Sequence, residues 1–305
     1  MPEQPEISEP GAVAVRQPRL PAPIRAMRPR QWIKNVLVLS VPLAAGRLFE
    51  PAVLLNAALA FVAFCLISAS IYLINDVRDV EEDRQHPKKR FRPIAAGELG
   101  TRPAVILAGV CGVIGLGLGF VTAIPLGLTL TAYAVIQVGY STWLKHWPVI
   151  DLAVVSSGFL LRAVAGGVAT GIVLSQWFLL VASFGSLFMV AGKRYSELKS
   201  LGVEAGTRRS LERYSQSYLR FVWMLAAGTV LVSYSLWAFE NRGEPWLGVP
   251  WTALSIAPFT LALLQYALEI DAGTAGEPED IVLKDRILQV LGVLWLILIA
   301  IAVFL

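Results

Sequence analysis

Three aspartates with helical spacing follow the second long apolar segment of this 305-residue chain. If a helix continues through them, Asp76, Asp79 and Asp83 lie on one face. Their carboxylates repel one another unless a cation lies between them. Carboxylate oxygens select a hard cation, and Mg²⁺ that bridges to substrate phosphates fits this ligand set. The spacing therefore predicts a catalytic Mg²⁺ site at Asp76, Asp79 and Asp83, with a solvated acidic loop as the alternative.

A run of basic residues follows in the same segment. Lys88, Lys89 and Arg90, followed by Arg92, come shortly before Pro93. The bias of positive charge toward the cytoplasmic ends of membrane spans would explain the run by itself. Its position directly after the aspartates favours a second anion site equally well. Both interpretations stay open, and Lys88, Lys89 and Arg90 are candidates for substrate binding.

A second polar cluster follows a later apolar segment. Lys193, Arg194 and Glu197 open this cluster in the sequence GKRYSEL. Lys193 and Glu197 are four residues apart, so they could form an ion pair on one helix. The alternative is that Lys193 and Arg194 bind phosphate oxygens directly. All three residues are candidates for substrate binding.

A third group brackets a short turn between two apolar segments. Tyr140 and Lys145 lie before the turn and Asp151 lies after it, while Arg162 falls in the middle of the next apolar segment. An arginine in hydrocarbon is costly, so Arg162 should face the protein interior. We expect it to pair with Asp151 or with a substrate phosphate, and pairing for structure alone is an equal alternative. Tyr140, Lys145 and Arg162 complete the set of candidate substrate-binding residues.

The composition places these residues in a membrane protein. The chain is 56% hydrophobic and 16% charged, with a mean hydropathy of +0.62. Apolar runs of helical length predict an all-α, polytopic bundle of about nine transmembrane spans. The expected spans lie near residues 33–49, 52–75, 104–122, 125–143, 150–171, 176–192, 219–239, 249–268 and 287–305. The first is interrupted by polar residues and short for a full crossing.

Charge predicts the orientation and the domain organisation. Every Lys and Arg except Arg47, Arg162 and Arg242 lies on the same side of the membrane as the N-terminus, either in a connecting segment or at the end of a span. This bias predicts a cytoplasmic N-terminus. The chain is then a multi-pass plasma membrane protein. Residues 1–24 are rich in proline and small residues and predict a disordered cytoplasmic tail. Residues 25–305 then form a single membrane-embedded domain. The basic face suits phosphorylated substrates rather than nucleic acid, and homo-oligomer formation stays open.

The motif Asn75-Asp76-x-x-Asp79-x-x-x-Asp83 resembles that of the UbiA-type intramembrane prenyltransferase superfamily. The segments RPRQWIKN at 28–35 and YSTWLKHWPVID at 140–151 agree with it. The resemblance implies that the motif, Asn75 included, binds Mg²⁺ and the diphosphate of a donor substrate on the cytoplasmic side. The same resemblance would predict a second Asp-rich motif, commonly DxxxD, where this chain has GKRYSEL instead.

With GKRYSEL at this position, the chain resembles the subgroup of decaprenyl-phosphate phosphoribosyltransferases of mycobacteria and their relatives. That similarity implies transfer of 5-phosphoribosyl from 5-phosphoribosyl 1-diphosphate to decaprenyl phosphate, for the synthesis of a cell-wall arabinan precursor. Lys193 and Arg194 would then bind a donor phosphate in place of a second metal site. The alternatives are a prenyltransferase that moves a prenyl group to an aromatic acceptor and, in another class, a transporter.

Overall fold

The computed structural model describes residues 20–142, 144, 147–201, 214–240, 248–275, 281 and 284–304. Every regular element in these ranges is a helix, as the sequence predicts. The long helices are α3 (Pro51–Arg78), α5 (Thr101–Thr122), α6 (Ile124–Thr142), α7 (Pro148–Thr170), α8 (Gln176–Leu201), α9 (Gln216–Glu240), α11 (Ile256–Ala272) and α13 (Arg286–Phe304). The short ones are α1 (Ala22–Ala26), η1 (Pro29–Leu39), α2 (Ser40–Ala44), α4 (Val80–Gln85), η2 (Lys89–Phe91) and α10 (Trp251–Leu254).

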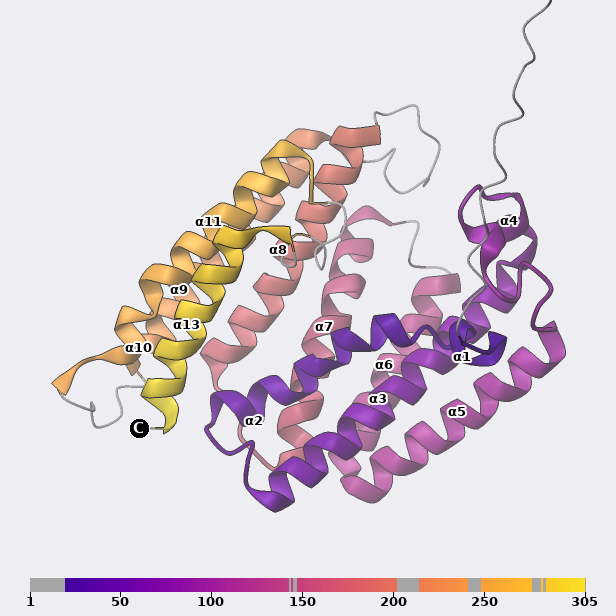
Figure 1. Ribbon diagram of the computed structural model, residues 1–305, viewed down its shortest axis with the longest axis horizontal. Coiled ribbons are helices and arrows are strands. Elements are labelled where there is room, and N and C mark those ends of the chain that lie inside the picture. The colour runs from indigo at the N-terminus through magenta and orange to yellow at the C-terminus, as the bar shows by residue number, and fades with distance from the viewer. Residues whose placement is uncertain are drawn as a thin grey trace, which may run out of the picture.

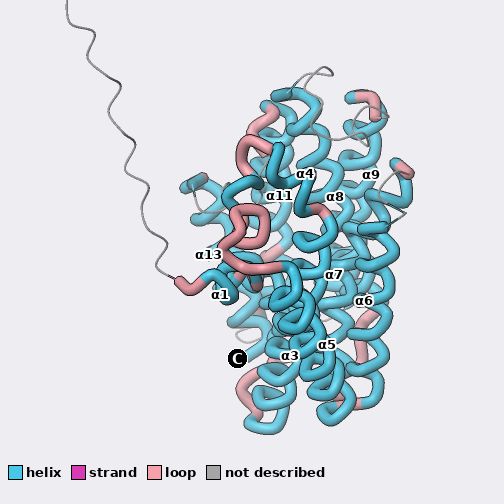
Figure 2. The backbone as a smooth tube through the Cα atoms, turned by 90° about the vertical axis from the view of Figure 1, so that its right-hand side faces the viewer, coloured by secondary structure: helices cyan, strands magenta, loops and turns pink. Residues whose placement is uncertain are grey.

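The polytopic all-α class is confirmed by the length and composition of the long helices. Eight of them, counting α10 and α11 as one, are long and apolar enough to cross a membrane. They correspond to the last eight of the nine expected spans. Figure 2 shows the long helices running side by side along one direction. Lys145 and residues 1–19 of the expected tail lie outside the described residues, and α1 begins at Ala22, inside the predicted tail.

The first expected span, 33–49, forms two short helices rather than one α-helix. Most of it belongs to η1, a 3₁₀ helix, and to α2, which follows directly. A 3₁₀ helix rises about 2.0 Å per residue against about 1.5 Å in an α-helix, so η1 and α2 together extend about 30 Å. In Figure 1 this segment runs beside α3 from α1 to the far end of the bundle. A stretch too short to cross as an α-helix thus matches the thickness of a hydrocarbon core.

Burial along η1 repeats every three residues, as 3₁₀ geometry requires. Ile33 and Val36 are exposed, at 64% and 44% of their surface, whereas Asn35 and Val38 are fully buried. The exposed pair suits lipid. The buried pair faces α3 and α7, the two long helices against which η1 packs.

A glycine of α7 lets η1 approach closely. A Cβ atom added to Gly166 would lie 1.9 Å from the carbonyl oxygen of Val38. Gly166 is therefore a packing residue at the contact between η1 and α7.

Replacing Gly166 by alanine should therefore destabilise the protein. The methyl group has no room beside a backbone carbonyl, and overpacking of this kind costs about 1–3 kcal/mol. Gly117→Ala is the matched control, because its added Cβ would meet no atom within 4 Å. Thermal unfolding in detergent should show a lower Tm for Gly166→Ala than for Gly117→Ala. Equal melting temperatures would contradict the close contact.

The candidate residues that the structure describes, other than Arg162, gather at one end of the bundle. Arg28 is paired with Asp76, so α1 and the start of η1 lie where α3 ends (Figure 1). The C-terminal ends of α6 and α8 and the N-terminal end of α7 meet in contacts of Tyr140 and Arg194 with Asp151. The opposite end holds residue 49 and the end of α13, where the rings of Phe49 and Phe304 lie 6.0 Å apart.

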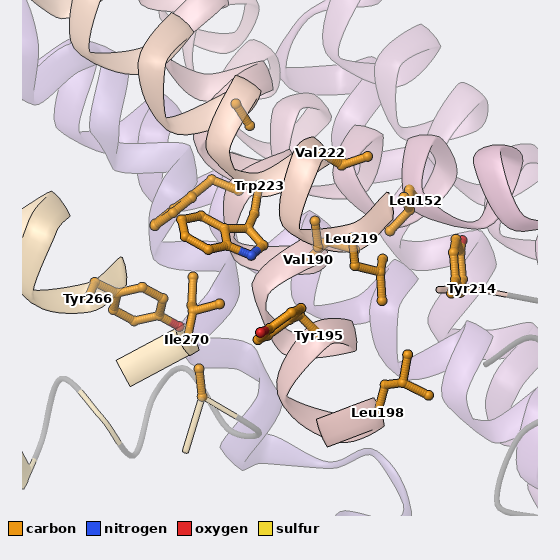
Figure 3. Packing of buried hydrophobic residues seen from close by; sticks show 14 of the residues in the cluster. Leu152, Val190, Tyr195, Leu198, Tyr214, Leu219, Val222, Trp223, Tyr266 and Ile270 are labelled. Atoms are coloured by element: carbon orange, nitrogen blue, oxygen red, sulfur yellow. The ribbon is translucent and has the colours of Figure 1, made fainter. Parts of the chain in front are cut away.

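An aromatic core fixes the end of α8 that carries this cluster. Tyr195 is 1% exposed and packs between α8, α9 and α11 (Figure 3). Its ring lies 6.4 Å from that of Trp223. Phe188, one of the same buried cluster, lies 5.6 Å from the ring of Tyr266. This packing holds the α8 backbone at positions 193 and 194, whose side chains leave the helix in other directions than Tyr195.

Candidate active site

Two of the three aspartates converge on one arginine. Asp76 and Asp83 are 3% and 1% exposed. A single nitrogen of Arg92, Nη1, lies 3.2 Å from Asp76 Oδ1 and 2.6 Å from Asp83 Oδ2. Buried carboxylates are costly without a positive partner. Arg92 supplies that charge and joins the end of α3 to α4 and η2.

Arg28 is the second cation on this pair. Its guanidinium donates to Asp76 Oδ1 and lies 4.9 Å from the centre of the Tyr72 ring. Among the described residues, Arg28 is the one non-glycine residue with a positive φ, 55°. Backbone of this kind costs of order 1 kcal/mol or more and persists where surrounding contacts require it. The strained turn before η1 directs Arg28 onto the carboxylates.

The expected convergence of three aspartates is only partly observed. The α-helix ends at Arg78, and Asp79 caps it with φ −91° and ψ 14°. This break changes the direction of the chain, so Asp79 lies half-buried at the junction between α3 and α4. No group of three His, Cys, Asp or Glu side chains close enough to share a metal occurs in the part of the chain that the structure describes. The prediction of a three-carboxylate cluster is therefore wrong in its geometry.

Two convergent carboxylates nevertheless fit Mg²⁺. Asp76 and Asp83 both reach one cationic nitrogen, so their oxygens are spaced to share a small cation. Mg²⁺ commonly takes one or two protein carboxylates and completes its shell with water and substrate phosphates. Asn75 is half-buried on the same turn, and its carbonyl oxygen accepts the backbone N–H of Asp79.

The basic run divides between this site and the surface. Lys89 Nζ lies 3.8 Å from Asp83 Oδ1. Lys88 is exposed, and the guanidinium of Arg90 covers the ring of Phe91 at 4.8 Å. The structure brings Lys89 to the carboxylates, whereas Lys88 and Arg90 face outward.

A second buried cluster centres on Asp151. This carboxylate is completely buried and accepts hydrogen bonds from Tyr140 (2.6 Å) and from Nε and Nη2 of Arg194 (3.2 Å each). The Tyr214 hydroxyl lies 3.5 Å from it and donates to the carbonyl of Pro148. Burial, reinforced by the charge of Asp151, raises the pKa of the Tyr214 phenol, so the hydroxyl keeps its proton.

Lys193 and Glu197 form the expected pair, but loosely. Lys193 Nζ lies 3.9 Å from Glu197 Oε1, at the limit of an ion pair. Glu197 also accepts a hydrogen bond of 3.3 Å from Arg194. Arg194 is 5% exposed and shared between two carboxylates, whereas the side chain of Lys193 is 35% exposed. The two cations that the sequence treats alike thus differ: Arg194 is a structural partner of Asp151, and Lys193 can turn toward a ligand.

A cavity of about 580 Å³ lies beside this cluster. Its polar wall consists of Lys34, Tyr140, Lys193 and Arg194 together with Ser186. The remaining wall is apolar apart from the glycine, and comprises Leu37, Val155, Phe159, Val181, Ala182, Gly185, Met189 and Val190. The cavity therefore joins a cationic end to an apolar body.

Arg162 does not pair with Asp151, so that expectation is wrong. Asp151 is taken by Arg194, and Arg162 donates to Asn35 Oδ1 (2.7 Å), the Gly158 carbonyl (2.6 Å) and the Tyr133 hydroxyl (3.0 Å). All three guanidinium nitrogens thus have neutral acceptors. Arg162 is a buried structural residue and not a substrate ligand in this arrangement.

Two residues of the site were not singled out from the sequence, and a third was named only as a member of the basic run. Arg28 and Lys34 lie in the motif RPRQWIKN, and Arg92 lies in the basic run. A lysine inside an expected span was a usable signal for Lys34, because charged residues there mark function. For Arg28 and Arg92 the sequence offers no signal beyond clustering, since their acidic partners become neighbours only when α1, η2 and α3 meet.

Comparison with known proteins agrees with this architecture. The model of the UbiA prenyltransferase family matches residues 36–280. The chain is 50% identical over 286 residues to a Corynebacterium glutamicum protein named decaprenyl-phosphate phosphoribosyltransferase, covering 92% of this chain and 86% of that one. It is 51% identical over 285 residues to the Mycobacterium tuberculosis protein of the same name, covering 92% and 93%.

Solved structures show the same fold. A UbiA homologue from Archaeoglobus fulgidus, bound to GPP and Mg²⁺, superposes with a TM-score of 0.69 at 19% identity and covers 92% of this chain and 98% of its own. A digeranylgeranylglyceryl phosphate synthase superposes with a TM-score of 0.62 at 17% identity, covering 93% and 98%. The helical bundle, the aspartate motif at one end and these matches lead to one conclusion: the chain belongs to the UbiA prenyltransferase family.

Proposed function

We propose that this chain transfers a 5-phosphoribosyl group from 5-phosphoribosyl 1-diphosphate to decaprenyl phosphate and releases diphosphate. The names of relatives that are about half identical over most of both chains support this assignment. The product would be a precursor of cell-wall arabinan. We further propose that the active site faces the cytoplasm across the plasma membrane, because the basic ends of the helices lie on that side under the positive-inside rule.

The observation that carries the proposal is the cavity with a cationic end. An apolar body ending in Lys34 and Lys193 suits an amphipathic anion, namely a lipid phosphate whose chain lies against Leu37, Phe159 and Met189. We therefore assign the cavity to the acceptor. This revises the expectation that Lys193 and Arg194 bind the donor, because an apolar wall offers a sugar phosphate few partners.

The carboxylate site suits the donor diphosphate. Asp76 and Asp83 would hold Mg²⁺, which would neutralise the charge that develops on the leaving diphosphate. Arg28 and Arg92 have side chains that are 27% and 29% exposed, so they can move from the carboxylates to phosphate oxygens. Lys89 is the nearest further cation. Asp79 and Asn75, on the adjoining turn, are candidates for contacts to the same group.

The reaction needs no strong general base. A phosphomonoester has a second pKa of about 6, so the acceptor is largely dianionic at neutral pH. Its oxygen would form the new bond to C1 of the ribose as the bond from C1 to the diphosphate breaks. Lys34 and Lys193 would orient that oxygen, and positioning together with electrostatics would carry the rate.

A transfer assay tests the function. Purified protein in detergent with Mg²⁺, labelled 5-phosphoribosyl 1-diphosphate and polyprenyl phosphate should give a labelled lipid and free diphosphate. A parallel reaction with a prenyl diphosphate and an aromatic acceptor tests the rival prenyltransferase. Product in the second reaction alone would overturn the proposal.

Lys193→Ala should raise the acceptor KM while leaving the donor KM unchanged. Loss of one charge-assisted hydrogen bond to phosphate costs about 1.5–3 kcal/mol, or about 10- to 150-fold in affinity. Arg47→Ala is the control, since Arg47 pairs with Glu50 at the opposite end of the bundle. Steady-state kinetics with each substrate varied in turn gives the answer. A rise in the donor KM alone would return Lys193 to the donor site.

A further inference from the structure

Asn35 and Arg162 form a buried polar network that joins η1 to α7. Asn35 is fully buried and accepts from Arg162, while its own amide nitrogen lies 3.2 Å from Cys65 Sγ. Arg162 is 5% exposed and lies over the rings of Tyr133 and Phe64 at 5.0 and 5.4 Å. Its charge is thus held by neutral acceptors and aromatic faces. Burying an arginine without a carboxylate partner costs free energy. Asn35 is neutral and does not cancel the charge of Arg162, so we look for another role of this contact.

Two contacts attach η1 to α7, one turn apart on each helix. Asn35 meets Arg162, and Val38 meets Gly166 through its carbonyl. Residues three apart eclipse in a 3₁₀ helix, and residues four apart share a face in an α-helix. The pair 35 and 38 therefore matches the pair 162 and 166. The 3₁₀ form of η1, which is unusual over 11 residues, makes this match close, because three residues of a 3₁₀ helix rise as far as four residues of an α-helix.

The same geometry directs Lys34 into the cavity. Lys34 and Leu37 both line the cavity and are three residues apart. Lys34 lies between the exposed Ile33 and the buried Asn35. Leu37 lies in the same way between the exposed Val36 and the buried Val38. The three faces of η1 are thus lipid, cavity and protein core. If the core face shifted, the cavity face would turn with it.

We propose that Asn35 and Arg162 are positioning residues that hold η1 in register on α7 so that Lys34 reaches the phosphate bound at the cationic end of the cavity. The inference rests on the proposed function in one respect, because that function identifies the phosphate as the lipid acceptor's. Neither residue touches the substrate. Their effect passes through Lys34.

A double-mutant cycle separates positioning from simple stabilisation. The measured quantity is the Kd of a short-chain polyprenyl phosphate for the detergent-solubilised full chain without donor, together with Tm. Lys34→Ala and Asn35→Ala should each weaken binding about tenfold or more, as expected for loss of a charge-assisted contact. The double variant should bind no more weakly than Lys34→Ala alone. Equal losses from Asn35→Ala in both backgrounds, or a lower Tm with unchanged Kd, would overturn the inference.

Further variants keep the test decisive if Asn35→Ala does not fold. Arg162→Lys retains the charge, but its compact ammonium cannot span the three acceptors that the planar guanidinium reaches. Gly166→Ala displaces η1 from the second contact. Both should weaken binding in the wild-type background and have little further effect beside Lys34→Ala. Val36→Ala, on the exposed face, and Gly117→Ala, on α5, should leave Kd unchanged.

A readout that needs no ligand distinguishes failure of the inference from failure of the proposed function. Lys34→Cys should react with a water-soluble maleimide through the cavity, whereas Cys65 and Cys111 are buried. Adding Asn35→Ala should change that labelling rate severalfold, and adding Val36→Ala should not. Wild-type protein that binds no polyprenyl phosphate would overturn the proposed function. An unchanged labelling rate would overturn the positioning role by itself.

Discussion

Asp76→Asn and Asp83→Asn should each abolish transfer while the protein remains folded. Asparagine keeps the size of the side chain but removes the charge that a Mg²⁺ ion on a diphosphate requires. Loss of such electrostatic stabilisation costs about 10²- to 10³-fold in kcat, and loss of the ion itself costs more. The initial rate of diphosphate release at saturating Mg²⁺ checks this expectation, and a Mg²⁺ titration shows whether more metal restores activity.

Two further variants define that result. Glu81→Gln lies in the same segment, but Glu81 is exposed and pairs with Arg84, so the change should leave kcat unchanged. Asp79→Asn should reduce activity less than the two buried positions, because Asp79 lies outside the Arg92 cluster. Near-normal turnover in Asp76→Asn would mean that the metal is held elsewhere. An effect of Asp79→Asn as large as that of Asp83→Asn would restore the three-carboxylate site.

Helical periodicity explains how far the acidic site could be predicted. Asp76 and Asp83 converge as their spacing indicates, but they lie on different helices, α3 and α4, and meet at Arg92 rather than on one continuous helix face. Asp79 does not, because the helix breaks at that residue. A break of this kind depends on the contacts that α4 and η2 make with the rest of the bundle. It has no clear signal in a sequence that contains neither glycine nor proline at that point.

The partners of the charged residues were the least predictable feature. Arg162 contacts Asn35, which is 127 positions away, and Arg194 contacts Asp151 across 43 positions. Periodicity carries information about neighbours on one helix, which is why the Lys193 and Glu197 pair was foreseen. Contacts between helices depend on how η1, α7 and α8 pack. The 3₁₀ form of η1 could not be predicted for the same reason, because η1 packs closely against Gly166 of another helix.

Asp151→Ala should be strongly destabilising. The change leaves the Arg194 guanidinium buried with only the 3.3 Å contact to Glu197, and removal of one member of a buried ion pair costs about 3–5 kcal/mol. It also removes the 2.6 Å hydrogen bond from Tyr140 to Asp151, which should loosen the polar wall of the cavity. Thermal unfolding in detergent measures the first effect, and the acceptor KM of any folded fraction measures the second.

The double variant Asp151→Asn with Arg194→Gln provides the decisive comparison. A buried pair pays a desolvation cost for both charges, so removing both should restore much of the stability that either single change loses. Glu197→Gln should be milder than Asp151→Ala, because Glu197 is the more exposed of the two partners. If the double variant recovers its Tm but not its acceptor affinity, Arg194 contributes charge to the cavity as well as structure. If the double variant is no more stable than Asp151→Ala, the pair is not the unit that joins α6, α7 and α8, and the hydrogen bond of Tyr140 must carry that role.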